Sequence, residues 1–263
     1  PITKGPRMRI TSDHIRDSPK MRSFKRKTIT HMAFLLFCGF VVSSANAMNT
    51  SGQALSNPLV LYGNGIEFDV FRDGKKVGKH SVRFEETPSG KLKVTARLDL
   101  QVTFLGIPVY DYAYHSIAQW RKGRLVGLAV KIDDDGEKSA VSASMQGEDL
   151  VVVGPKGKMI IPYAIFPTNH WNAVVLSRSR VLNTLSGEIS QVKISKQGSE
   201  KIRAEGRLIE ATKYQYAGDI DTSVWYDDKG RWVKMRFPAK SGSVIDYECT
   251  ACGIILKRNM TAK

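Results

Sequence analysis

The stretch that decides the fold is KLKVTARLDLQVTF, residues 91–104. Apolar and polar side chains alternate along it, and this period of two predicts a β-strand with one buried face and one hydrated face. Such a strand would run for about 45 Å at ~3.3 Å per residue. A twisted sheet of strands this long tends to curl. The seven apolar positions are Leu92, Val94, Ala96, Leu98, Leu100, Val102 and Phe104.

Similar alternating segments, separated by tight turns, lie on both sides of this strand. Asp73-Gly74 and Asp135-Gly136 are typical hairpin turns, because glycine accepts the positive φ that they require. Alternation breaks between residues 167 and 190, where we predict one or two short helices. Strands resume as separate segments at 191–195 and 202–205. The chain is therefore predicted to be mainly β, with a single antiparallel, strongly curved sheet that forms a half-barrel or a barrel.

The first part of the chain has the three regions of a secretory signal peptide. Basic residues follow Met21, an apolar run covers 32–42, and Ala45 and Ala47 form a small-x-small cleavage site. The apolar run is far shorter than the roughly 20 residues of a membrane-spanning helix. We expect residues 1–20 to be an over-extended start, 21–47 to be the signal peptide, and 48–263 to be a single mature β-domain. After cleavage behind Ala47, this domain would reside in the periplasm with no transmembrane segment.

The predicted cleavage changes the charge of the protein. The full chain carries 40 Lys and Arg residues against 25 Asp and Glu residues, a net charge of +15. Nine of the basic and two of the acidic residues precede position 48, so the mature domain keeps 31 and 23, a net charge of +8. This moderate excess suits an anionic envelope surface. We expect no nucleic acid partner, since an exported bacterial protein rarely meets nucleic acid.

Cleavage would remove Cys38 and leave Cys249 and Cys252, spaced as Cys-x-x-Cys, in an oxidising compartment. We predict that they form a structural disulfide. A redox pair is the alternative, in which a thiolate attacks another disulfide, although the adjacent Glu248 would disfavour the thiolate. We expect no metal and no cofactor, because zinc takes about four ligands and haem attachment would need a histidine where Gly253 stands.

Two groups of residues are candidates for ligand binding. Tyr110, Tyr112 and Tyr114 share one face of a predicted strand, where they would either line a cavity or pack in the core. His170 and Trp171 stand in the segment without strands, from which they would either reach into the mouth of the sheet or cap and pack a helix. Another cluster of basic residues would either form a solvated outer face, which is the simpler interpretation, or contact the phosphates of lipid headgroups or lipopolysaccharide: Lys229, Arg231, Lys234 and Arg236.

Four segments together make the mature chain resemble a family of uncharacterised exported β-domain proteins of Gram-negative bacteria, a domain of unknown function. These segments are Phe68–Gly78, His170–Asn172, Trp225–Val233 and Tyr247–Cys252. The resemblance implies a secreted β-domain, similar in architecture to the half-barrels of periplasmic lipoprotein carriers. It implies no activity and no catalytic residues.

These observations favour a periplasmic binding or carrier module for an apolar ligand, such as a lipid or an acyl chain, without catalysis. One alternative is a structural or assembly factor of the envelope that binds another protein. A second alternative is a redox protein that uses Cys249 and Cys252. The chain has no nucleophile elbow, phosphate-binding loop, dinucleotide fingerprint or His-Glu-x-x-His helix, so its motifs make no positive case for an enzyme.

Overall fold

The computed structural model describes residues 57–239 and 241–253, which belong to one compact unit. The predicted start (1–20) and signal peptide (21–47) lie outside these residues. Among the described residues, no helix has the length and apolar character needed to cross a membrane.

The described residues form a single sheet of fifteen strands, and within them two short helical segments accompany it. The strands are β1 (Gly65–Arg72), β2 (Lys75–Glu86), β3 (Leu92–Phe104), β4 (Ile107–Arg121), β5 (Arg124–Asp134), β6 (Glu137–Gln146), β7 (Asp149–Gly154), β8 (Gly157–Ile161), β9 (Phe166–Pro167), β10 (Arg180–Leu182), β11 (Ile189–Ala204), β12 (Arg207–Gly218), β13 (Thr222–Tyr226), β14 (Trp232–Pro238) and β15 (Val244–Ala251). The helical segments are α1 (Pro58–Tyr62) and a 3₁₀ turn, η1 (Ala173–Ser177).

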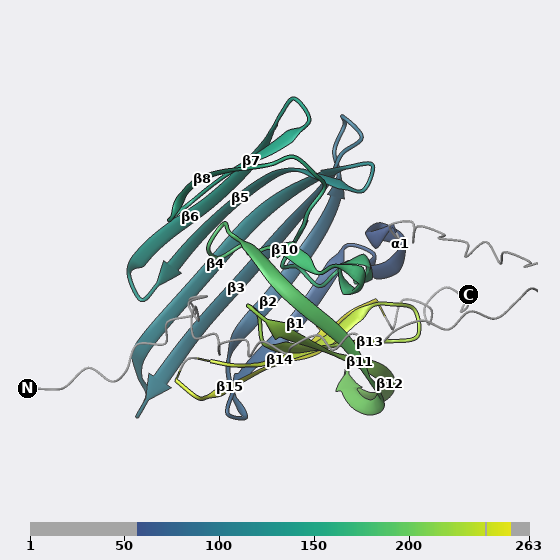
Figure 1. Ribbon diagram of the computed structural model, residues 1–263. Coiled ribbons are helices and arrows are strands. Elements are labelled where there is room, and N and C mark those ends of the chain that lie inside the picture. Colours follow the sequence, from purple (N-terminus) through teal and green to yellow (C-terminus); the bar gives the residue numbers. More distant parts are fainter. Residues whose placement is uncertain (1–56, 240, 254–263) are drawn as a thin grey trace, which may run out of the picture. The chain divides into compact units, whose positions relative to one another are not determined.

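Strand order follows the chain in two runs that meet at the first and last strands. The order is β8-β7-β6-β5-β4-β3-β2-β1-β15-β14-β13-β12-β11-β10-β9. Figure 1 shows the broad wall of β2–β8, with β11–β15 curling away from it and the segment that holds β10 inside the curve. The prediction of one strongly curved, mainly β sheet is confirmed.

The two edges of the sheet, β8 and β9, do not pair with each other, but the β7–β8 turn packs against the loop between β10 and β11. A Cβ atom added at Gly154, at the end of β7, would lie 2.6 Å from the carbonyl oxygen of Ser186. Beside this contact, Lys156 Nζ lies 2.9 Å from a carboxylate oxygen of Glu188. The two halves of the curved sheet are therefore joined here by backbone packing and an ion pair. No hydrogen-bonded pairing of the described strands links them at this point.

Five of the hairpins turn through two residues that both have positive φ, the type I′ geometry that matches the twist of the flanking strands. The first residues of these turns have φ of 48–53° and the second residues are glycines with φ of 73–89°. Three of the turns lack the Asn or Asp that marks such turns in a sequence: Leu105-Gly106, Lys122-Gly123 and Glu205-Gly206. The remaining two are Asp73-Gly74 and Asp135-Gly136.

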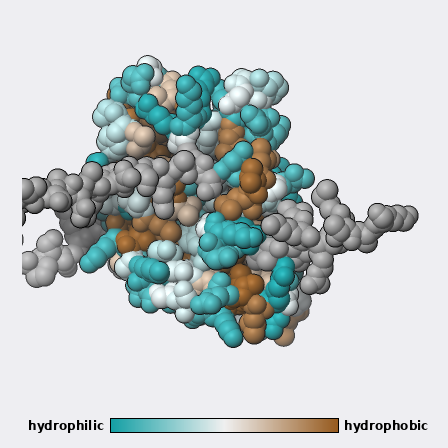
Figure 2. Space-filling view, turned by 90° about the vertical axis from the view of Figure 1, so that its right-hand side faces the viewer, coloured by the Kyte–Doolittle hydropathy of each residue, from teal (hydrophilic) through white to brown (hydrophobic). Residues whose placement is uncertain are grey.

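Apolar side chains gather on the inner face of the sheet. Along β3, Val94, Leu98 and Leu100 are buried, while the intervening charged residues face outward. On the face shown in Figure 2, hydrophilic side chains divide the apolar surface into separate patches. The tip of the β3–β4 hairpin is an exception, because Phe104, Leu105, Ile107 and Val109 are all exposed there.

The structure corrects three details of the prediction. Residues 191–195 and 202–205 belong to one strand, β11, which continues through a bulge near Gly198. The expected helical segment holds only η1, followed by the strand β10, and the second helix, α1, lies before the first strand instead. Within the described residues, one strand pair is parallel: β9 and β10 run in the same direction because the chain loops back through η1 between them.

Candidate functional site: an apolar cavity inside the curved sheet

A cavity of about 260 Å³ lies inside the curve of the sheet. Its wall comes mainly from β2, β3, β4 and β14, and from the irregular segments 168–171 and 183–185. Larger hollows of about 580 and 610 Å³ lie on the outer face, among charged side chains such as Asp99 and Asp133. The inner cavity is the better candidate site, because small-molecule sites are concave, mostly apolar and hold a few well-placed polar groups.

Aromatic rings form the floor of the cavity. The ring centroid of Trp232 lies 5.7 Å from that of His80 and 5.4 Å from that of His170. Trp171 packs edge-on against Phe84 with a centroid distance of 5.4 Å. Asn172 holds this segment in place, since its Oδ1 accepts a hydrogen bond of 3.1 Å from the backbone N–H of Val174 and caps η1.

The mouth of the cavity lies at the turn between β12 and β13, where a lining residue is exposed. Asp221 is exposed there, and its Oδ1 accepts a hydrogen bond of 2.8 Å from Gln215 Nε2. The half-buried side chains of Leu185, Ile220 and Phe237 also line the cavity. The wall near the mouth is thus largely apolar, with one carboxylate at its rim.

The two histidines of the floor are neutral at physiological pH. Burial lowers the pKa of His170 to about 4. Burial, and to a lesser degree the neighbouring His170, lowers the pKa of His80 to about 3. Burial likewise raises the pKa of Tyr112 and Tyr114 above the ordinary tyrosine value, so both phenols keep their protons.

The structure brings four of the five predicted ligand-binding residues around this cavity. Tyr112, Tyr114, His170 and Trp171 line it, whereas Tyr110 does not. Tyr110 points to the same side of β4 but lies nearer the hairpin tip, where its hydroxyl donates a hydrogen bond of 2.7 Å to Asp134 Oδ1. The role of these residues in binding stays a prediction.

Sequence reasoning missed His80 and Trp232 as cavity residues. The sequence does indicate that His80 faces inward, because it lies two and four residues before the apolar Val82 and Phe84. Side chains at this spacing point to the same face of a strand. Trp232 follows Arg231, one of the basic residues expected to form a solvated outer face, and that expectation is wrong for Arg231. Trp232 is buried in the floor, and Arg231 is buried beside it, because Asp227 compensates its charge.

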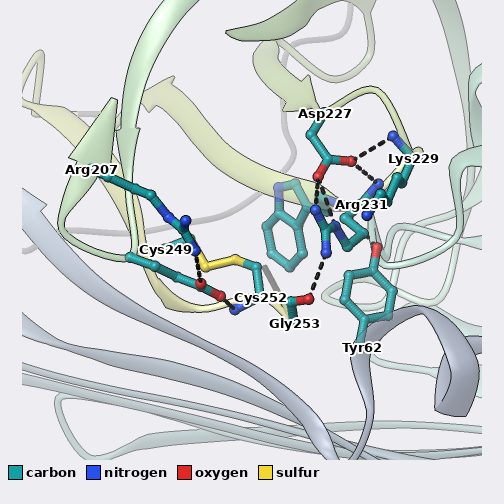
Figure 3. Close-up of polar contacts among 10 residues, drawn as sticks. Tyr62, Arg207, Asp227, Lys229, Arg231, Cys249, Cys252 and Gly253 are labelled. Carbon is teal, nitrogen blue, oxygen red and sulfur yellow. Dashed lines mark hydrogen bonds and ion pairs between the residues drawn. A yellow bond between two sulfur atoms is a disulfide. The ribbon is translucent and has the colours of Figure 1, made fainter. Parts of the chain in front are cut away.

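Around the β13–β14 turn, a group of polar contacts ties distant segments together (Figure 3). The Tyr62 hydroxyl accepts a hydrogen bond of 2.9 Å from the backbone N–H of Trp232 and donates one of 2.8 Å to the carbonyl of Trp171. Arg231 forms an ion pair with Asp227 and donates from a terminal nitrogen to the carbonyl oxygen of Gly253, 2.5 Å away. These contacts hold α1, the β13–β14 turn and the end of β15 beneath the floor of the cavity.

The structure joins the sulfurs of Cys249 and Cys252 in a disulfide, with their Cα atoms 6.2 Å apart. Both residues are almost completely buried, at 1% and 0% exposure. A redox enzyme needs a thiolate that its substrate can reach, so this burial weighs against the redox alternative. The Glu205 carboxylate lies within 4.8 Å of both sulfurs, but metal ions are bound by thiolates and not by sulfurs that are paired with each other.

Comparison with known proteins agrees with this picture of the fold. The sequence profile of a domain of unknown function, DUF6134, matches residues 68–250. The chain belongs to the DUF6134 family. The expected resemblance to a family of uncharacterised β-domains is therefore confirmed, while likeness to lipoprotein carriers stays a prediction. No curated protein matches this DUF6134 chain.

A solved structure shares the fold of the DUF6134 domain. It is the crystal structure of a β-barrel-like protein of domain of unknown function DUF1849 from Brucella abortus. The TM-score is 0.50, and the match covers 70% of this chain and 94% of that chain at 10% sequence identity. At so low an identity, the likeness shows the fold alone.

Proposed function

We propose that this DUF6134 domain is an exported binding or carrier module for a small apolar ligand, such as a single acyl chain. The cavity inside the curved sheet carries the proposal. Its volume of about 260 Å³ is just below the range of ~300–1,000 Å³ that is usual for small-molecule sites. This size suits one chain better than a whole phospholipid, and the mostly apolar wall would bury it from water.

Export to the periplasm is part of the proposal and rests on the sequence of residues 21–47. The full chain should be expressed in a Gram-negative host, and the periplasmic fraction should be analysed by intact mass. We expect a species that begins at Met48. A matched variant with Ala45→Asp and Ala47→Asp should accumulate uncleaved, and retention of the unmodified full chain in the cytoplasm would overturn the export proposal.

Ligand binding is tested with a cavity-filling variant. Ala96 lines the cavity and is half-buried, whereas Ala113 lies on the outer face of the neighbouring strand β4. Ala96→Phe should reduce binding of the neutral fluorescent probe N-phenyl-1-naphthylamine at least tenfold. Ala113→Phe is the control and should bind like the unmodified domain, with circular dichroism confirming that both variants fold. Absence of probe binding to the unmodified domain would sink the proposal.

A second candidate is an envelope assembly factor that binds another protein. The exposed apolar tip of the β3–β4 hairpin favours it, because β2 and β5 pair with these strands only as far as Leu100 and Tyr112. Crosslinking followed by affinity purification distinguishes the two candidates. A stable protein adduct that Leu105→Asp abolishes would support the assembly factor, whereas co-purified lipid without a protein partner would support the carrier.

A further inference from the structure

The mostly apolar wall of the cavity holds several hydrogen-bonding groups but little charge. Among the described residues that line it, Asp221 is the one carboxylate and stands at the mouth, and none is a lysine or an arginine. Since His80 and His170 are neutral, the interior offers no countercharge to a charged ligand. Burying a charge without a partner is costly, so such a wall selects against ionised groups.

Three buried polar atoms of cavity-lining residues have no hydrogen-bond partner within the described part of the chain. They are His80 Nδ1, Asn169 Oδ1 and Trp171 Nε1. A buried donor or acceptor that stays unsatisfied costs about 1–3 kcal/mol. Native proteins pair nearly all such groups with protein, water or ligand atoms. Their residues line the cavity, so a side-chain rotation that turns one of these atoms inward would let it pair with a polar group of a ligand.

Polar groups and apolar side chains both line the cavity. Trp171 belongs to the floor, Asn169 lies in the same segment, and the ring of His80 packs beside Trp232 on the adjoining wall. Leu185, Ile220 and Phe237 add apolar side chains to the same wall. A ligand with one polar group and one apolar chain would match this mixed wall.

We propose that the ligand of this cavity is an uncharged amphiphile, a single apolar chain whose hydroxyl, amide or ester group hydrogen-bonds with the inner wall. Carboxylate and phosphate ends are disfavoured because no lysine or arginine is among the described lining residues, and an ammonium end is disfavoured because the one lining carboxylate, Asp221, is exposed to solvent. This inference rests on the proposed function, since it requires that the cavity binds an apolar chain at all.

Three ligands of equal chain length test the inference: decan-1-ol, decanoate and decylammonium, each titrated at pH 7.5 against bound N-phenyl-1-naphthylamine. We expect decan-1-ol to displace the probe at a concentration at least tenfold lower than either charged ligand. Displacement by decanoate or decylammonium at an equal or lower concentration overturns the inference and leaves the carrier proposal standing. If the probe does not bind at all, the carrier proposal itself fails, and this inference fails with it.

A substitution tests the role of the unpaired polar atoms. His80→Leu removes one of them without adding a charge, so the variant is expected to fold. We expect the preference for decan-1-ol over decanoate to fall at least threefold. Asn169→Leu provides a second variant with the same expected result, and the outward-facing Ala113→Leu should keep the full preference. If His80→Leu and Asn169→Leu both keep the full preference for decan-1-ol, these atoms do not recognise the ligand and the inference is overturned.

Discussion

Asp227 and Arg231, which flank the tip of the β13–β14 turn, form a buried ion pair in which Arg231 Nε lies 2.7 Å from Asp227 Oδ2. Only 7% of the arginine side chain and 5% of the aspartate side chain are exposed. Asp227 Oδ1 also accepts backbone hydrogen bonds of 3.0 Å from Lys229 and 2.9 Å from Arg231. One carboxylate thus fixes both the turn and the guanidinium that reaches Gly253.

Asp227→Asn should strongly destabilise the domain, because it leaves the charge of Arg231 buried without compensation. We expect the free energy of unfolding to fall by about 3–5 kcal/mol, measured by urea denaturation. Glu85→Gln is the control, since it breaks an ion pair of 3.0 Å with Lys93 in which both side chains are well exposed. That change should cost less than ~1 kcal/mol, and equal losses in the two variants would contradict the structural role of the buried pair.

Replacing both Cys249 and Cys252 with alanine should lower stability without abolishing ligand binding. The loop that their disulfide closes is very short, so the loss of chain entropy in the unfolded state corresponds to about 2 kcal/mol. Urea denaturation and probe titration of the same variant separate stability from function. Loss of function in a variant that still folds would favour the redox alternative over a structural disulfide.

The prediction of the sheet from the sequence succeeded where a strand buries one face. Residues 91–104 alternate because one side of β3 packs in the core and the other meets water. The same signal disappears in β11 between Lys196 and Lys201, where every residue is exposed and neither face imposes a pattern. One strand was therefore predicted as two.

The cavity could be predicted only in fragments. The period of two marked Tyr112 and Tyr114 as facing one side, and the break in alternation marked His170 and Trp171 as standing off the sheet. Their meeting around Trp232 depends on how far the sheet curls and on the contacts of Tyr62 with Trp171 and Trp232, which are 109 and 170 residues away in the chain. Local sequence patterns carry no information on such distant contacts.

The type I′ turns depend on glycine for its conformation and not for its small size. Gly136 has φ of +89°, and a Cβ atom there would meet nothing within 4 Å. Gly136→Ala should still cost about 1–2 kcal/mol, because an L-residue is strained at positive φ. Gly127 on the adjoining strand β5 is the control: its added Cβ would make ordinary contacts of 3.6 Å or more, so Gly127→Ala should be neutral or slightly stabilising. Urea denaturation of the two variants measures the difference, and equal effects would contradict the turn assignment.

The buried histidines should make the domain less stable in acid. Burial lowers the pKa of His170 to about 4 and that of His80 to about 3, whereas in the unfolded chain both titrate near the ordinary value of about 6.5. As the pH falls below about 6.5, the unfolded chain takes up protons that the folded domain refuses until about pH 4, so stability is full above about pH 6.5 and falls progressively below it. Each histidine contributes up to about 1.4 kcal/mol per pH unit in this window.

Urea denaturation between pH 5 and pH 6 measures this slope. His170→Asn removes one of the two groups and should reduce the slope by about 1 kcal/mol per pH unit, whatever its effect on stability at pH 7. The control is His115→Asn, because His115 lies on the outer face of β4 and is only partly buried, between Arg97 and Lys131. It should change the slope less than His170→Asn does. An unchanged slope in His170→Asn would mean that His170 takes up its proton in the folded domain as readily as in the unfolded chain, and the floor of the cavity would then carry a charge.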